Sequence, residues 1–173
     1  MSLHEGRREE ARDFIDEALD VARQTDIGFH LLDRIYGTRI NLHADDPAAA
    51  LHVMEDASAS VRGPLETCPG CRITFAVPAA IAAARAGELA LANKHEQQCA
   101  YLADVVMRLP AWYAAHDEVR GHFAAASQRG GEESVARFAA AAARFHAAGH
   151  PLDAERCRRL AADAAAGTRG TVR

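Results

Sequence analysis

The 173-residue chain contains few aromatic residues and no long apolar run. Aromatic residues make up 6% of the chain, whereas 49% of it is hydrophobic, and much of that fraction is alanine. Because alanine buries little area per contact, we expect a thin, elongated core. No stretch reaches the ~18 consecutive apolar residues that a membrane-spanning helix requires. The first ten residues are charged throughout and do not resemble a signal peptide, so we expect a cytoplasmic location.

The chain also lacks an excess of positive charge. It has 20 lysine and arginine residues against 24 aspartate and glutamate residues, which gives a formal net charge of −4. Surfaces that bind nucleic acids or anionic membranes are usually basic. We therefore predict no direct nucleic-acid partner and no membrane partner.

Alternating β-branched residues, the pattern that marks strands, are absent as well, and the apolar spacing is helical nearly everywhere. Helix breakers lie at Gly87, Pro110, Gly130 and Gly149. We predict an all-α fold of seven to eight antiparallel helices. The first expected helix runs from about residue 5 to 24, the second starts at a cap at Thr25 or Asp26, and the third starts at a cap at Asp46. The fourth and fifth run from about 73 to 86 and from about 88 to 107. The sixth starts at Pro110 and stops at Gly130, the seventh ends at Gly149, and the eighth starts at His150.

Three helix starts share one pattern, in which a breaker or cap precedes a short polar or small run and an apolar stretch. They begin at Asp46, Gly87 and Gly131, at spacings of 41 and 44 residues. This is about the length of one helical hairpin, which is typical of helix pairs stacked as a tetratricopeptide-like (TPR-like) solenoid. A generic helical bundle stays open as the alternative. We predict one helical-repeat domain over residues 1–166 and a flexible tail over 167–173.

Four potential metal ligands lie within 32 residues. Cys68 and Cys71 form a Cys-x-x-Cys turn, and His95 and Cys99 lie four residues apart on one helical face. If a helix starts near residue 74 and the chain turns back at Gly87, the antiparallel neighbour brings Cys99 beside the cysteine pair. Three cysteines and one histidine form a structural zinc site without an open position. We therefore predict structural zinc bound by Cys68, Cys71, His95 and Cys99.

Two alternatives to zinc remain open. The turn can carry two incidental cysteines, with Cys99 in the core and His95 on the surface. Cys68 and Cys71 can also form a thiol redox pair, although the thioredoxin-like case requires a βαβ context, and none is visible.

Other residues with reactive side chains have structural explanations. His116 and His122 do not share a helical face, and we expect solvated i,i+4 pairs with Arg120 and Glu118 rather than acid–base chemistry. Arginine neighbours could lower the pKa of the Cys157 thiol, but we favour a buried structural cysteine there. Three aromatic residues are expected to fill the space between hairpins: Trp112, Tyr113 and Phe123.

Several short stretches carry a family resemblance. They are Cys68-Pro69-Gly70-Cys71, the run Ala-Arg-Ala-Gly-Glu-Leu-Ala at 84–90, His95, Pro110-Ala111-Trp112, Glu118-Val119-Arg120 and the run from Ala148 to Cys157. With them the segment 68–160 resembles the C-terminal TPR-like arm of large ATP-binding LuxR-type transcriptional regulators of actinobacteria, and residues 28–58 match the preceding repeat more loosely. The resemblance implies a helical scaffold linked to transcription regulation. It carries over no ATPase or DNA-binding activity, because the chain has no Gly-x-x-x-x-Gly-Lys-Ser/Thr loop and only about eight residues after its last predicted helix.

Three classes of function compete. We favour a non-enzymatic interaction module that binds a protein or peptide through its helical surface. A small-molecule-binding regulatory sensor is the second class. An enzyme has the least support, because no catalytic constellation is visible. Leu152 and Leu160 of the last helix remain available to a second copy, which favours a homodimer.

Overall fold

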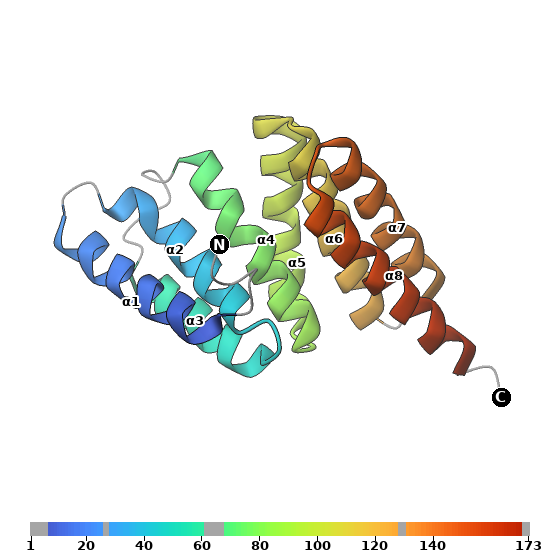
Figure 1. Ribbon diagram of the computed structural model, residues 1–173, viewed down its shortest axis with the longest axis horizontal. Coiled ribbons are helices and arrows are strands. Elements are labelled where there is room, and N and C mark those ends of the chain that lie inside the picture. Colours follow the sequence, from blue (N-terminus) through green and yellow to red (C-terminus); the bar gives the residue numbers. More distant parts are fainter. Residues whose placement is uncertain (1–6, 26–27, 61–67, 128–130, 171–173) are drawn as a thin grey trace.

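The computed structural model describes residues 7–25, 28–60, 68–127 and 131–170 (Figure 1). These ranges contain eight α-helices, one π-helical segment and no strand, so the predicted all-α fold is confirmed. None of the helices in these ranges is long and apolar enough to cross a membrane. The elements are α1 (Arg8–Gln24), α2 (Phe29–Leu42), α3 (Pro47–Ser60), α4 (Pro69–Arg85), α5 (Leu89–Ala100), η1 (Tyr101–Met107), α6 (Pro110–Ala126), α7 (Gly131–Ala147) and α8 (Pro151–Gly170).

Caps and glycine turns separate the helices where the sequence places them. The Ala49 N–H donates to Asp46 Oδ1 at 3.0 Å, so Asp46 caps α3 as predicted. Gly87 and Gly149 have φ values of +81° and +80°. Gly87 follows α4, and Gly149 follows α7. At each of these positions, the N–H of the glycine and the N–H of the next residue donate hydrogen bonds to carbonyl groups in the last turn of the helix, which is the pattern of a Schellman C-cap. A left-handed residue ends each helix and reverses the chain, which makes α4–α5 and α7–α8 antiparallel hairpins.

Along the long axis of the molecule, α1, α2 and α3 lie at one end, α4 and α5 in the middle, and α6, α7 and α8 at the other end (Figure 1). Helix α4 packs against α2, α3, α5 and α6, and α6 in turn packs against α5 and α7. Gly37 allows the close approach of α2 and α4, because a Cβ atom there would lie 2.2 Å from the Thr74 carbonyl oxygen. This arrangement of neighbouring hairpins is that of a helical repeat.

The core is divided into three consecutive clusters instead of one central mass. The first cluster contains residues of all helices from α1 through α5. The second contains residues of α4, α5, η1 and α6, and the third contains residues of α6, α7 and α8. Alanine is the commonest residue in the third cluster and recurs through the other two. The thin, elongated core expected from composition is therefore present.

Some element boundaries differ from the predicted ones. Helix α4 begins at Pro69 rather than near residue 73, because Cys68 is its N-cap and proline suits the first helical position. Thr25 is the C-cap of α1 in an extended conformation and not an N-cap, and Asp26 lies outside the described residues. Helix α8 continues to Gly170, past the predicted domain end at residue 166, and residues 171–173 lie outside the described part.

Candidate functional site

The structure brings Cys68 and Cys71 together, as their spacing predicts. Cys68 is the exposed N-cap of α4, and Cys71 is buried in its first turn at 8% exposure. Backbone N–H groups of Cys71 and Gly70 lower the pKa of the Cys68 thiol. Burial raises the pKa of Cys71, as does the hydrogen bond between the two thiols. The turn therefore presents one accessible and one protected sulfur.

Cys99 does not lie beside this pair. It is fully buried against Ile73 and Ala76, and burial, with a contribution from Glu96, raises the pKa of its thiol to about 12. Because α4 starts about one turn earlier than expected, antiparallel pairing around Gly87 sets Cys99 level with roughly residue 75 and not with the cysteine turn.

The four predicted zinc ligands consequently do not surround one point. In the described ranges, no three histidine, cysteine, aspartate or glutamate side chains gather closely enough to hold a metal ion. The arrangement supplies two sulfur ligands from the α4 turn, whereas a structural zinc site needs four ligands. Zinc binding by Cys68, Cys71, His95 and Cys99 stays a prediction.

His95 lies on α5 beside a groove instead of beside the cysteines. Its ring meets the Phe75 ring edge-on, with centroids 5.8 Å apart. Burial, then the positive charges of Arg72 and Lys94, lower the pKa of His95 to about 4, so the ring is neutral at pH 7. The Nδ1 atom is buried and has no hydrogen-bond partner.

The groove has a cavity volume of about 1020 Å³ and lies between α3 and α5, both of which pack on α4. We call it the α3–α5 groove. Apolar side chains line much of it: Leu51, Met54, Phe75, Leu91 and Leu102. Polar side chains interrupt this surface: Asp33, Glu55, Ser58, Arg72, Glu88, Lys94, His95, Gln98 and Tyr101. The groove can therefore hold a ligand with both an apolar body and hydrogen-bonding groups.

A buried ion pair fixes the polar part of the groove. Asp33 of α2 is 1% exposed, and its Oδ1 accepts a hydrogen bond from Arg72 Nη1 at 3.0 Å. The Arg72 guanidinium lies over the Phe75 ring, 5.1 Å from its centroid. Asp33 Oδ2 is buried without a hydrogen-bond partner, as is His95 Nδ1. Unpartnered buried polar atoms are costly, and a ligand that pairs with them removes that cost.

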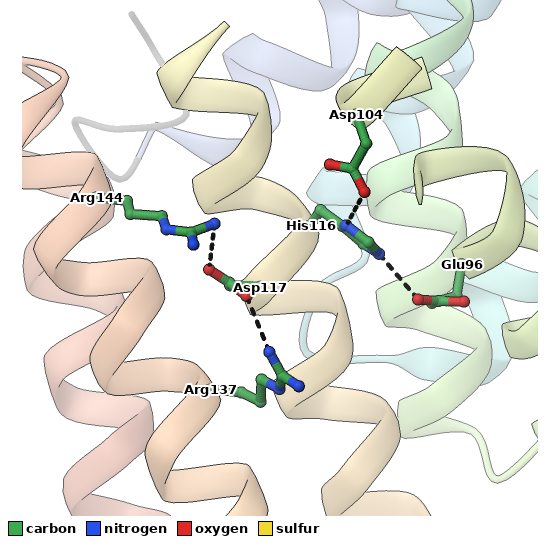
Figure 2. Close-up of polar contacts among 6 residues, drawn as sticks. All are labelled: Glu96, Asp104, His116, Asp117, Arg137 and Arg144. Atoms are coloured by element: carbon green, nitrogen blue, oxygen red, sulfur yellow. Dashed lines mark hydrogen bonds and ion pairs between the residues drawn. The ribbon is translucent and has the colours of Figure 1, made fainter. Parts of the chain in front are cut away.

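A second polar arrangement lies around α6, where His116 is 8% exposed. His116 Nε2 and Glu96 Oε1 form a hydrogen bond of 2.8 Å, and His116 Nδ1 lies 3.6 Å from Asp104 Oδ2 (Figure 2). The hydrogen bond to His116 lowers the pKa of Glu96. Asp104 belongs to the π-helical segment η1, so this contact ties η1 and α5 to α6.

The next two residues of α6 pair with the following hairpin. Asp117 lies 3.4 Å from Arg137 Nη1 and 2.9 Å from Arg144 Nη1, both on α7 (Figure 2). Glu118 accepts two hydrogen bonds from Arg156 of α8, at 2.8 and 2.7 Å. Three consecutive side chains thus connect α6 to α5, η1, α7 and α8.

The prediction of solvated pairs on α6 is wrong. His116, Asp117 and Glu118 are all buried, and the partners of each come from other helices, not from the next turn of α6. His122 stacks edge-on against Phe138 at 4.9 Å, and burial lowers its pKa to about 4. The physical reason is that α6 is enclosed by α4, α5 and α7, which leaves it no broad solvated face.

Three other predictions from the sequence concern the Cys157 thiol, the aromatic residues between hairpins and the exposed side of α8. Cys157 is fully buried in the third cluster, and burial, then Glu118, raises the pKa of its thiol to about 12, which confirms a structural cysteine. The predicted aromatic packing is confirmed, because Trp112, Tyr113 and Phe123 pack against the core clusters. Leu152 is 65% exposed, and self-association through it stays a prediction.

No protein-family model, no curated protein and no solved structure matches the chain. The resemblance to the arm of LuxR-type regulators therefore rests on the short stretches of sequence alone.

Proposed function

We propose that the protein is a non-enzymatic helical-repeat module that binds a peptide segment of a partner protein in the α3–α5 groove. The observation that carries this proposal is the groove itself, with a cavity volume of about 1020 Å³. Pockets for small molecules usually enclose about 300–1000 Å³. A groove at the upper end of that range fits an extended segment better than a compact metabolite.

The lining chemistry supports a peptide in particular. Leu51, Met54 and Leu91 offer apolar contacts to side chains. Asp33 Oδ2 can accept a hydrogen bond from an N–H group, and His95 Nδ1 can exchange one with a backbone amide. A peptide supplies these groups at a regular spacing, and helical repeats commonly bind extended segments along such surfaces.

The other polar residues support binding rather than chemistry. His116, Asp117 and Glu118 are occupied by Glu96 and by arginines of α7 and α8. The proposed role in bacterial transcription regulation rests on the sequence resemblance. A small-molecule sensor is the second candidate, because the same unpartnered atoms would also suit a compact polar ligand.

A selection of random peptides displayed on phage, with the intact protein immobilised, tests the proposal. Selected peptides are then measured by fluorescence anisotropy against Tyr101→Glu, whose parent side chain lines the groove and is 60% exposed. Phe14→Glu on α1 is the matched control, since Phe14 is an aromatic residue that is 57% exposed and does not line the groove.

We expect Tyr101→Glu to weaken binding about tenfold or more, which corresponds to about 1.4 kcal/mol, and Phe14→Glu to leave it within about twofold. Equal affinities for the two variants would place peptide binding outside the groove. If the selection yields no binding peptide, and a mixture of metabolites binds in the groove instead, the small-molecule sensor is the favoured function.

A further inference from the structure

The cysteine turn at the start of α4 lies outside the function proposed for the groove. Cys68 O accepts hydrogen bonds from the N–H groups of Cys71 and Arg72, both at 2.9 Å, so the turn is tight. A turn with such a hydrogen bond between residues i and i+3 brings their Cα atoms within about 7 Å. Disulfides span Cα distances of about 4.4–6.8 Å. The backbone of the turn is therefore compatible with a Cys68–Cys71 disulfide.

The two side chains project from the same turn, in which the Cys71 N–H donates to Cys68 O, so one sulfur can reach the other by side-chain rotation without a change of fold. Gly70, between them, has no Cβ, and an atom in that position would lie 3.7 Å from Cys68 Sγ. Cys68 faces solvent, while Cys71 is 8% exposed and is protected from reagents in solution. An incoming molecule thus meets Cys68 first and Cys71 only through Cys68.

We propose that Cys68 and Cys71 form a redox-active dithiol that exchanges with low-molecular-weight disulfides of the glutathione type. Cys68 is the attacking cysteine and Cys71 the resolving cysteine. The proposal does not depend on the groove or its ligand. It uses the two ligands that the structure brings together and requires no third, in contrast to the zinc site.

The reaction has two exchange steps. In the first, the Cys68 sulfur attacks one sulfur of oxidised glutathione, the glutathione S–S bond breaks, and a mixed disulfide forms. The first glutathione leaves as a thiol with the proton that Cys68 gave up. In the second, the Cys71 sulfur attacks the Cys68 sulfur, the mixed disulfide breaks, and the second glutathione leaves with the Cys71 proton. The protein loses two electrons and two protons, and one glutathione disulfide becomes two thiols.

The other two cysteines provide internal controls. Cys99 and Cys157 are both 0% exposed and lie in the second and third core clusters. Neither can be reached by a disulfide in solution while the protein is folded. Reaction confined to the α4 turn is therefore a specific expectation of this structure.

The test is to incubate the full chain with oxidised glutathione, quench with iodoacetamide, and identify products by intact-mass and peptide mass spectrometry. We expect the wild-type protein to lose two hydrogens and form the Cys68–Cys71 disulfide, which dithiothreitol reverses. Cys71→Ser should retain one glutathione on Cys68, because the resolving thiol is missing. Cys68→Ser should lose the reaction, and Cys157→Ala should react like the wild type.

Three outcomes would overturn the proposal. One is a wild-type protein that keeps glutathione on Cys68 without forming the internal disulfide. Another is a Cys71→Ser variant, folded by circular dichroism, that gains no adduct at Cys68. The third is a pair that reacts only after a chelator is added, since that result would assign both sulfurs to a metal ion.

Discussion

Replacement of Arg156 by alanine tests whether the buried ion pairs around α6 hold the hairpins together. Arg156 Nε and Nη2 donate to the two oxygens of Glu118 at 2.8 and 2.7 Å, and the Glu118 side chain is 4% exposed. Loss of one partner from a buried pair leaves an uncompensated charge, at a cost of about 3–5 kcal/mol. Because the Arg156 side chain is 42% exposed, water can approach Glu118 after truncation. We therefore expect Arg156→Ala to lower the free energy of unfolding by about 2–3 kcal/mol.

Two further variants separate this effect from a general cost of substitution. Arg158 lies two residues along α8 and pairs with Glu155 at the surface, where the side chains are 51% and 56% exposed. Arg158→Ala should cost less than about 0.5 kcal/mol, because exposed pairs contribute little. Replacement of Glu118 and Arg156 together by methionine should cost less than Arg156→Ala alone, since neither charge of the pair is then left without its partner.

Urea denaturation followed by Trp112 fluorescence and by circular dichroism measures these differences. In a domain of this size, 1 kcal/mol corresponds to about 2–4 °C in melting temperature, so Arg156→Ala should melt roughly 4–12 °C below the wild type. If Arg156→Ala proves as stable as Arg158→Ala, the reasoning fails, and the Glu118 carboxylate must be solvated or paired in another way.

Helix content and the position of several turns could be predicted because their signals are local. Asp46 caps the helix that follows it, and the glycines at 87 and 149 adopt the left-handed conformation that ends a helix. Such features depend on a few neighbouring residues and on apolar spacing. The start of α4 was misplaced by about one turn because the tight Cys68–Cys71 turn is itself the first turn of the helix.

This difference in the start of α4 determines which predicted zinc ligands meet. Because α4 begins about one turn earlier than expected, Cys68 and Cys71 lie at the helix start, whereas Cys99 packs in the core further along α4. The groove was not predictable, because Asp33, Arg72 and His95 come from three helices and are separated by long stretches of sequence. The α6 ion pairs were missed for a similar reason, since their partners lie 12 to 38 residues away.

Two predictions remain. The zinc site predicted from the sequence is tested by the metal content of protein purified without chelators: one zinc per chain, lost in Cys71→Ser, would support it, and zinc-free protein would contradict it. Burial lowers the pKa of His95 and His122 to about 4, against 6.5 for an ordinary histidine. Between pH 6.5 and 4 these two histidines bind protons in the unfolded chain but not in the folded protein. Their contribution to the free energy of unfolding is therefore fully present above pH 6.5 and is lost as the pH falls towards 4. The loss should reach a few kcal/mol, about 1.4 per pKa unit at most for each ring. Urea denaturation at several pH values should show a flatter profile for His95→Gln/His122→Gln than for the wild type, and identical slopes would mean that folding lowers the pKa of neither ring.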